Sequence, residues 1–108
     1  MIIMMKEILV LKISQSWRKG MTPDELYNAT RRSWKLSANR IASIDLVLCV
    51  AEKEVREAYT VDQWILSEDE GRKEFIGHVA SQEVRELWVG IDSSEIEAPY
   101  GVARYIAS

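Results

Sequence analysis

Apolar runs along the chain predict five β-strands. One of them, residues 44–51, is almost unbroken and is therefore typical of a central strand. The charged residues 52–54 that follow it predict a hairpin turn, and the acidic residues 67–73 predict a loop. The predicted strands cover residues 8–13, 44–51, 55–66, 74–80 and 102–107.

Alternation within the long third strand predicts which side chains share a face. One face is expected to carry Val55, Tyr59, Val61 and Ile65. The other is expected to carry Arg56, Thr60, Asp62 and Trp64. Trp64 would then lie among polar neighbours, unless a β-bulge shifts the register.

Two segments carry helix-start signals. Thr22 offers an N-cap oxygen, Pro23 needs no amide partner in the first turn, and Glu25 completes a capping box. This helix is expected to run to about residue 33, with Leu26, Ala29, Thr30 and Ser33 facing inward and Tyr27, Arg31 and Trp34 on a neighbouring stripe. The second helix begins after Ser81 and ends at Gly90, and it is expected to bury Val84, Leu87 and Trp88.

The order of strand, helix, three strands, helix and strand predicts an α+β fold, a small mixed β-barrel with two covering helices. The chain has 108 residues, of which 47% are hydrophobic, enough for one domain with one core over residues 1–108. Charges interrupt the apolar opening, so residues 1–13 predict neither a membrane span nor a signal peptide. We therefore expect a cytoplasmic protein that makes no use of a membrane.

Charge is distributed unevenly along the chain. Residues 1–40 carry eight Lys/Arg and three Asp/Glu, a net of +5, whereas residues 41–108 carry six and fourteen, a net of −8. Residues 16–40 hold six of the fourteen Lys/Arg and two of the four tryptophans, a composition suited to a phosphate-bearing ligand whose bases stack. The candidate phosphate contacts are Arg18, Arg31, Arg32, Lys35 and Arg40, and the candidate stacking planes are Trp17, Trp34 and Trp64.

Four segments resemble a family of small, mostly uncharacterised prokaryotic proteins with a PUA-like fold, related to the EVE and ASCH domains. They are WRKGMTPDELYNATRRSW (17–34), EVREAYTVDQW (54–64), KEFIGHVA (73–80) and ARYI (103–106). The pattern W-R-x-G-M followed by E-L-Y-x-A-T-R is the specific part of the resemblance. PUA-like domains are pseudobarrels that bind RNA or modified bases in DNA, so the resemblance implies a nucleic-acid or nucleotide ligand near the first helix. It points to Trp17, Arg18, Arg31, Arg32 and Trp34.

The chain departs from this family pattern near its end. A glycine-lysine pair and a later aromatic residue are expected there, but Gly90, Ile91, Asp92 and Glu95 stand in their place. If that lysine binds phosphate in the family, its absence here weakens the functional transfer. The residues also do not distinguish RNA from DNA or from a free nucleotide.

Other interpretations remain open at this point. Tryptophans in a small domain are usually part of the core, and Arg31 and Arg32 can stabilise the end of their helix through its dipole. A second hypothesis is a protein-interaction module or homodimer without a nucleic-acid ligand, which the pI of 5.2 favours. A third, a small hydrolase, depends on Cys49 as nucleophile and His78 as base. A single cysteine and a single histidine predict no disulfide, structural metal or cofactor.

Overall fold

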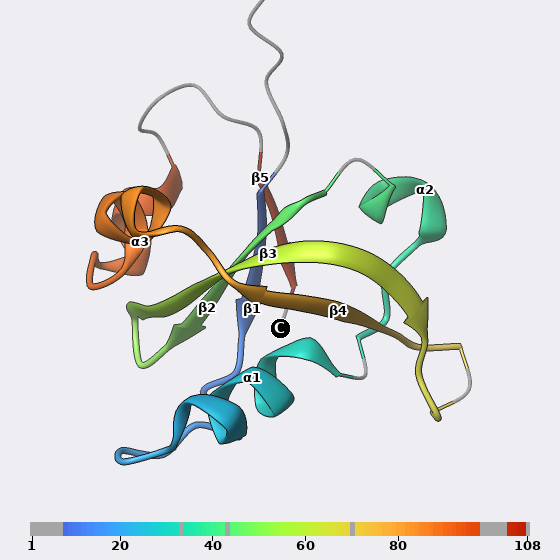
Figure 1. The fold of residues 1–108 in the computed structure, drawn as a ribbon, viewed down its shortest axis with the longest axis horizontal. Helices are drawn as coiled ribbons and strands as arrows, with labels where there is room; N and C mark the ends of the chain where they lie inside the picture. The colour runs from blue at the N-terminus through green and yellow to red at the C-terminus, as the bar shows by residue number, and fades with distance from the viewer. Residues whose placement is uncertain (1–7, 33, 43, 70, 98–103, 108) are drawn as a thin grey trace, which may run out of the picture.

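A five-stranded mixed sheet with helices on both faces forms the described part of the chain (Figure 1). The computed structural model describes residues 8–32, 34–42, 44–69, 71–97 and 104–107. The strands are β1 (Ile8–Lys12), β2 (Leu46–Ala51), β3 (Glu54–Leu66), β4 (Lys73–Val79) and β5 (Arg104–Ala107). They follow the order β4-β3-β2-β1-β5, which puts β2 at the centre as its apolar sequence predicted.

Strand directions give the sheet a parallel half and an antiparallel half. β1 pairs in parallel with β2 and with β5, whereas β2–β3 and β3–β4 are antiparallel. The parallel β1–β2 pair needs a crossover, which contains the helices α1 (Pro23–Arg31) and α2 (Ala38–Ile41). The chain leaves the carboxyl end of β1 and reaches the start of α1 through residues 13–22.

The helices begin where their caps predict. Thr22 Oγ1 accepts a hydrogen bond from the amide of Glu25, whose carboxylate accepts one from the Thr22 amide. The helix α3 (Gln82–Trp88) starts after Ser81, whose hydroxyl oxygen accepts a hydrogen bond from the Val84 amide, and a 3₁₀ helix, η1 (Ser93–Glu97), follows it. The sequence predicted α1 and α3 but treated α2 and η1 as irregular segments.

Two separate apolar layers cover the two faces of the sheet. Leu9 and Leu11 of β1 point to the α1 side, and Ile8 and Val10 point to the α3 side. In Figure 1 α1 lies beneath the arch of β3 and β4, while α3 lies beside the β2–β3 hairpin. A bidentate pair from Arg85 to Glu57, at 2.8 and 3.2 Å, ties α3 to β3.

Two register shifts change the faces of β3 from those that strict alternation predicts. A shift opposite Cys49 and Val50 places Val55 in the α3-side layer and Tyr59 in the α1-side layer, so the prediction that they share a face was wrong. A second shift, between Val61 and Gln63, turns Trp64 into the α1-side layer. The bulge that the sequence left open therefore decides the setting of Trp64.

The strand β4 comes unusually close to β3 at Gly77. A Cβ at this position would lie 2.0 Å from the Thr60 carbonyl oxygen, so only glycine fits. The Gly77 amide donates instead to the Tyr27 hydroxyl of α1, at 3.0 Å. At the other end of β4, the backbone of Lys73 exchanges two hydrogen bonds with that of Trp34. Residues of α1 and of the segment after it thus cover the outer edge of β4.

The α+β class and the mixed sheet are confirmed, but closure into a barrel is not. Among the described strands, β4 and β5 are the two edges and do not pair with each other. Within α3, Trp88 is buried as expected, whereas Leu87 is exposed, so its predicted inward position was wrong. The first two residues of the predicted closing strand, 102 and 103, lie outside the described residues.

Candidate functional site

A large cleft lies at the carboxyl end of β1. It has a volume of about 660 Å³ and extends from the turn after β1 to the last part of α1 and the loop before β4. We call it the β1 cleft, lined by Lys12, Ile13, Ser14, Gln15, Ser16, Ala29, Arg32, Trp34 and Arg72. Carboxyl ends of parallel strands are common ligand sites in open sheets, because loops diverge there.

Positive charge dominates this lining. Lys12, Arg32 and Arg72 come from a strand, a helix end and a loop, and the lining contains no carboxylate among the described residues. Lys12 and Arg32 are exposed and form no ion pair with any other described residue. The hydroxyls of Ser14 and Ser16 add hydrogen-bond donors. Such a lining is suited to an anion.

Trp34 is held in the wall of the β1 cleft by three hydrogen bonds. Its indole Nε1 donates to the Thr30 carbonyl at 2.8 Å, which directs the ring back along α1. Its backbone exchanges bonds of 2.9 and 2.8 Å with Lys73, which ends α1 at Arg31 instead of the predicted residue 33. The ring is half-buried, so part of it is available in the cleft.

Arg31 does not reach the β1 cleft, although it neighbours Arg32. Its guanidinium forms an ion pair with Glu74 of β4, and its Nε donates to Asn28. The same guanidinium stacks 5.7 Å from the centre of the Tyr27 ring. Arg31 thus acts in the structure as a tie between α1 and β4.

Arg18 and Trp17 are also engaged in contacts within the protein. Arg18 pairs with Glu25, and the pKa of Glu25 is lowered by the hydrogen bond from the Thr22 amide and then by this pair. Trp17 packs against the α1-side core, and Arg56 stacks 4.1 Å from its ring centre. Arg56 therefore covers one face of the Trp17 ring.

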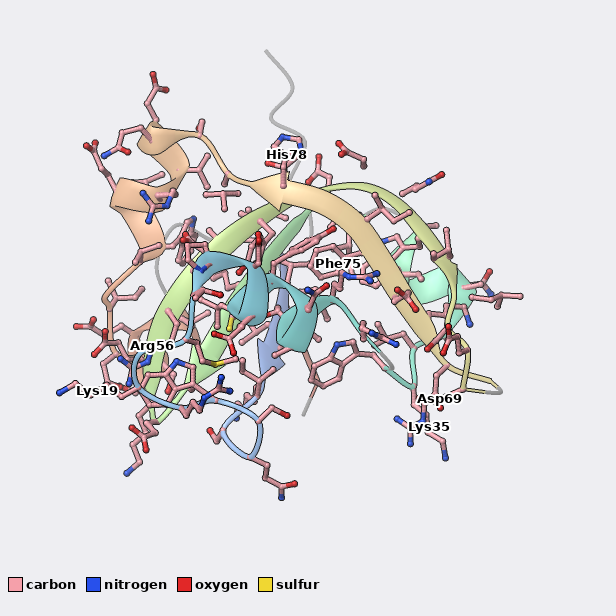
Figure 2. The ribbon with its side chains drawn as sticks, turned by 60° about the horizontal axis from the view of Figure 1, so that its bottom comes forward. Lys19, Lys35, Arg56, Asp69, Phe75 and His78 are labelled. Atoms are coloured by element: carbon pink, nitrogen blue, oxygen red, sulfur yellow. The ribbon has the colours of Figure 1, made fainter. Side chains whose placement is uncertain are left out.

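The remaining candidates lie apart from the β1 cleft. Trp64 packs edge-on against Phe75, and its Nε1 is buried without a hydrogen-bond partner among the described residues. Lys35 is exposed, and the side chain of Arg40 lies outside the described part of the structure. In Figure 2 Lys19 and Lys35 lie on opposite sides of the molecule, so the basic segment is spread out.

Of the eight candidate residues, the β1 cleft brings together Arg32 and Trp34. Sequence reasoning missed Lys12 and Arg72, which complete its charge. Lys12 could have been found as the first charge after a buried apolar strand, because such positions lie at a strand's carboxyl end. Arg72 was obscured by the acidic residues that precede it.

We compared the chain with protein-family models, curated proteins and solved structures. None of them matches it.

Cys49 and His78 do not form a catalytic pair. Cys49 is fully buried in β2, whereas the side chain of His78 is 64% exposed and its Nδ1 lies 3.2 Å from Asp62 Oδ2. Figure 2 shows His78 projecting away from β4.

No group of three or more His, Cys, Asp or Glu side chains in the described ranges is arranged to hold a metal. None of the helices in the described part of the chain is long and apolar enough to cross a membrane.

Burial makes Cys49 unreactive in the folded protein. Loss of solvation raises the pKa of its thiol to about 11, although a hydrogen bond with Thr30 acts in the other direction. At pH 8 about one thiol in a thousand is then ionised. We expect a thiol reagent such as DTNB to label Cys49 only when the protein is unfolded in guanidinium chloride. Ser16→Cys, which adds an exposed thiol, should react at once with one equivalent; rapid native labelling of the unmodified protein would contradict the prediction.

Proposed function

We propose that the protein is a binding module for single-stranded nucleic acid or a nucleotide, with the β1 cleft as its ligand site. One observation carries the proposal: cations from three elements converge on a cleft whose described lining holds no carboxylate and includes a tryptophan. Phosphate groups require cations and hydroxyl donors, and bases require an aromatic surface. The β1 cleft offers all three.

Each lining residue has a role in this proposal. Lys12 and Arg32 neutralise phosphate, Arg72 adds positive charge to the same wall, and the Ser14 and Ser16 hydroxyls donate to the phosphate oxygens. Trp34 provides a stacking surface that its bonds to Thr30 and Lys73 keep in place. The chemistry is binding without turnover, since the described lining of the cleft includes no histidine or carboxylate that could serve as a base for Ser14 or Ser16.

The fold assignment belongs to the same proposal. We infer a PUA-like pseudobarrel, because a strongly curved β3–β4 hairpin and helices on both faces suit an incomplete barrel. The resemblance of residues 17–34 to that family adds to the inference, and Arg32 and Trp34 belong to this segment. The fold inference does not depend on the lysine that the family pattern places near Gly90 and that this chain lacks.

Oligonucleotide binding provides the direct test. We expect single-stranded RNA or DNA hexamers to quench tryptophan fluorescence and to bind more weakly as salt rises, because phosphate contacts release counterions. Arg32→Gln should lower the affinity about tenfold and reduce the salt dependence by about one phosphate contact. Trp34→Phe should weaken binding at every salt concentration, since stacking is worth about 1 to 3 kcal/mol per base.

Lys19→Gln is the matched control, because it removes the same charge outside the β1 cleft. Circular dichroism melting should show that every variant remains folded. Equal losses in Lys19→Gln and Arg32→Gln would indicate non-specific attraction and would contradict a site in the cleft. If RNA, DNA and modified nucleotides all leave fluorescence and melting temperature unchanged, the proposed function is wrong.

A protein-interaction module or homodimer is the second candidate. It is favoured by exposed apolar side chains at the end of the β3–β4 hairpin, where Leu66 is 77% exposed. Beside it lies an apolar recess of about 250 Å³ lined in part by Ala38, Ala42 and Trp64. Sedimentation of the same samples separates the two candidates, because this one requires self-association or a partner without any response to nucleotides.

A further inference from the structure

A second cleft lies on the other side of Lys12. It has a volume of about 520 Å³ and we call it the hairpin cleft, because it is formed by the β2–β3 turn and η1 together with β1. Its lining includes Lys12, Lys53, Asp92, Ser93, Ser94 and Ile96. Lys12 lines both the β1 cleft and the hairpin cleft, so the two clefts meet at this residue.

Lys53 has a left-handed backbone conformation, which glycine adopts with less strain than lysine. The β2–β3 turn consists of Glu52 and Lys53, whose φ angles are 50° and 66°. Two-residue turns of this kind favour Asn-Gly or Asp-Gly, because a Cβ is strained at positive φ. A lysine here costs stability that glycine would not, and strain of this sort is often found at functional positions.

Hydrogen bonds join the strained turn to the segment after β1 and to the start of η1. The Glu52 amide donates to Ser14 Oγ at 3.3 Å, and the Ser93 amide donates to the Lys53 carbonyl at 2.8 Å. The side chain of Lys53 is exposed and forms no ion pair with another described residue. The turn therefore fixes the Lys53 backbone at the cleft that Lys12 also lines. The pKa of Asp92 is lowered by its hydrogen bonds with Ser94 and then by the charge of Lys53, so this ammonium interacts with the Asp92 carboxylate as well as with solvent.

We propose that the ligand is a single-stranded oligonucleotide that spans both clefts, with a linking phosphate at Lys12 and the next phosphate at Lys53. This inference depends on the proposed function of the β1 cleft and specifies its substrate class: at least two linked nucleotides, not a free nucleotide. A single nucleotide held in the β1 cleft would leave Lys53 without a role.

Asp92 places a carboxylate in the hairpin cleft, so that cleft is less positive than the β1 cleft. Its Oδ1 accepts a hydrogen bond from the Ser94 amide at 2.9 Å, which fixes the carboxylate at the start of η1. A fixed carboxylate and serine hydroxyls can accept and donate hydrogen bonds to the edge of a base, and Ile96 offers an apolar contact. The hairpin cleft therefore suits a base and its sugar, with phosphate limited to the two lysines.

Ligand length provides the test. The probes are the hexamers U6 and dT6 and the mononucleotides UMP and dTMP, titrated against the full chain. We expect both hexamers, or one of them if the sugar is recognised, to bind at least tenfold more tightly than the matching mononucleotide. Lys53→Gly should weaken hexamer binding about fivefold to tenfold, the contribution of one phosphate contact at moderate salt, and leave mononucleotide binding unchanged.

Two controls separate charge from fold. Lys53→Gly should also raise the melting temperature by several degrees, because glycine is unstrained at positive φ, so weaker binding could not be attributed to unfolding. Lys53→Arg keeps the charge and should keep hexamer affinity, whereas Arg32→Gln should weaken hexamers and mononucleotides alike.

The outcomes distinguish this inference from the proposed function. If hexamers and mononucleotides bind with equal affinity through Arg32, or if Lys53→Gly leaves hexamer binding unchanged, the ligand does not extend over the hairpin cleft and the inference is wrong while the proposed function stands. If no hexamer or mononucleotide binds, both are wrong.

Discussion

Gly77→Ala should destabilise the protein by about 3 kcal/mol or more, at the upper end for overpacking, because its Cβ would meet backbone atoms that cannot rotate away. The new methyl group would lie 2.0 Å from the Thr60 oxygen and 3.2 Å from the Val61 Cα. Relief requires β3 and β4 to separate beside the register shift of this pair, between Val61 and Gln63, which weakens the pairing and the Gly77–Tyr27 hydrogen bond. Urea unfolding followed by circular dichroism measures the loss.

Gly71→Ala is the matched control for this prediction. Gly71 has a φ of 76°, but a Cβ there would meet no atom within 4 Å. Its substitution should therefore cost only the backbone strain, about 1 kcal/mol. Similar losses in the two variants would mean that β3 and β4 adjust freely at Gly77, contrary to the close approach seen here.

Arg31→Met should destabilise the protein by about 3 kcal/mol, because it leaves the Glu74 carboxylate without its partner. The Glu74 side chain is 8% exposed and the Arg31 side chain 22%, and this partial exposure sets the expected loss at the lower end of the range for buried pairs. Methionine keeps much of the apolar packing of the arginine stem. The free energy of unfolding at pH 7 is the measurement.

Two comparisons show whether charge causes this effect. In Arg31→Met with Glu74→Met, most of the stability should return, since no carboxylate is then left unpaired. Arg18→Met breaks the exposed pair with Glu25, in which the side chains are 62% and 42% exposed, and should leave the free energy of unfolding nearly unchanged because solvent screens this pair. A double variant no more stable than Arg31→Met alone would attribute the effect to packing.

The arrangement of strands and helices was largely predictable, because local sequence signals mark the boundaries of most elements. Apolar runs located β1 to β4, and the capping residues Thr22 and Ser81 located α1 and α3. The faces of β3 were not predictable, since a bulge depends on how two strands fit together and leaves no mark in the pattern of one of them. The short α2 and η1 have too few residues for a periodic signal.

The candidate site was predictable only in part, for a different physical reason. Positive charge along the sequence does not indicate which cations face an acidic partner, and Arg31 meets Glu74 across 43 positions of chain. Likewise, the stack of Arg56 on Trp17 joins two distant segments. Arg32 and Trp34 line the β1 cleft together with Lys12 and Arg72, which the fold alone brings close.

The cover over the outer edge of β4 has a consequence for how the protein behaves at high concentration. An uncovered strand edge can pair with the same edge of another molecule and begin aggregation. Here the Gly77 amide donates a hydrogen bond to the Tyr27 hydroxyl, and the backbone of Lys73 exchanges two with the backbone of Trp34. The side chains of Ile76 and Val79 on β4 are exposed. Local unfolding of α1 would therefore expose the Gly77 amide next to apolar side chains. The contacts of this helix thus protect the edge of β4 from pairing with another molecule, in addition to stabilising the fold.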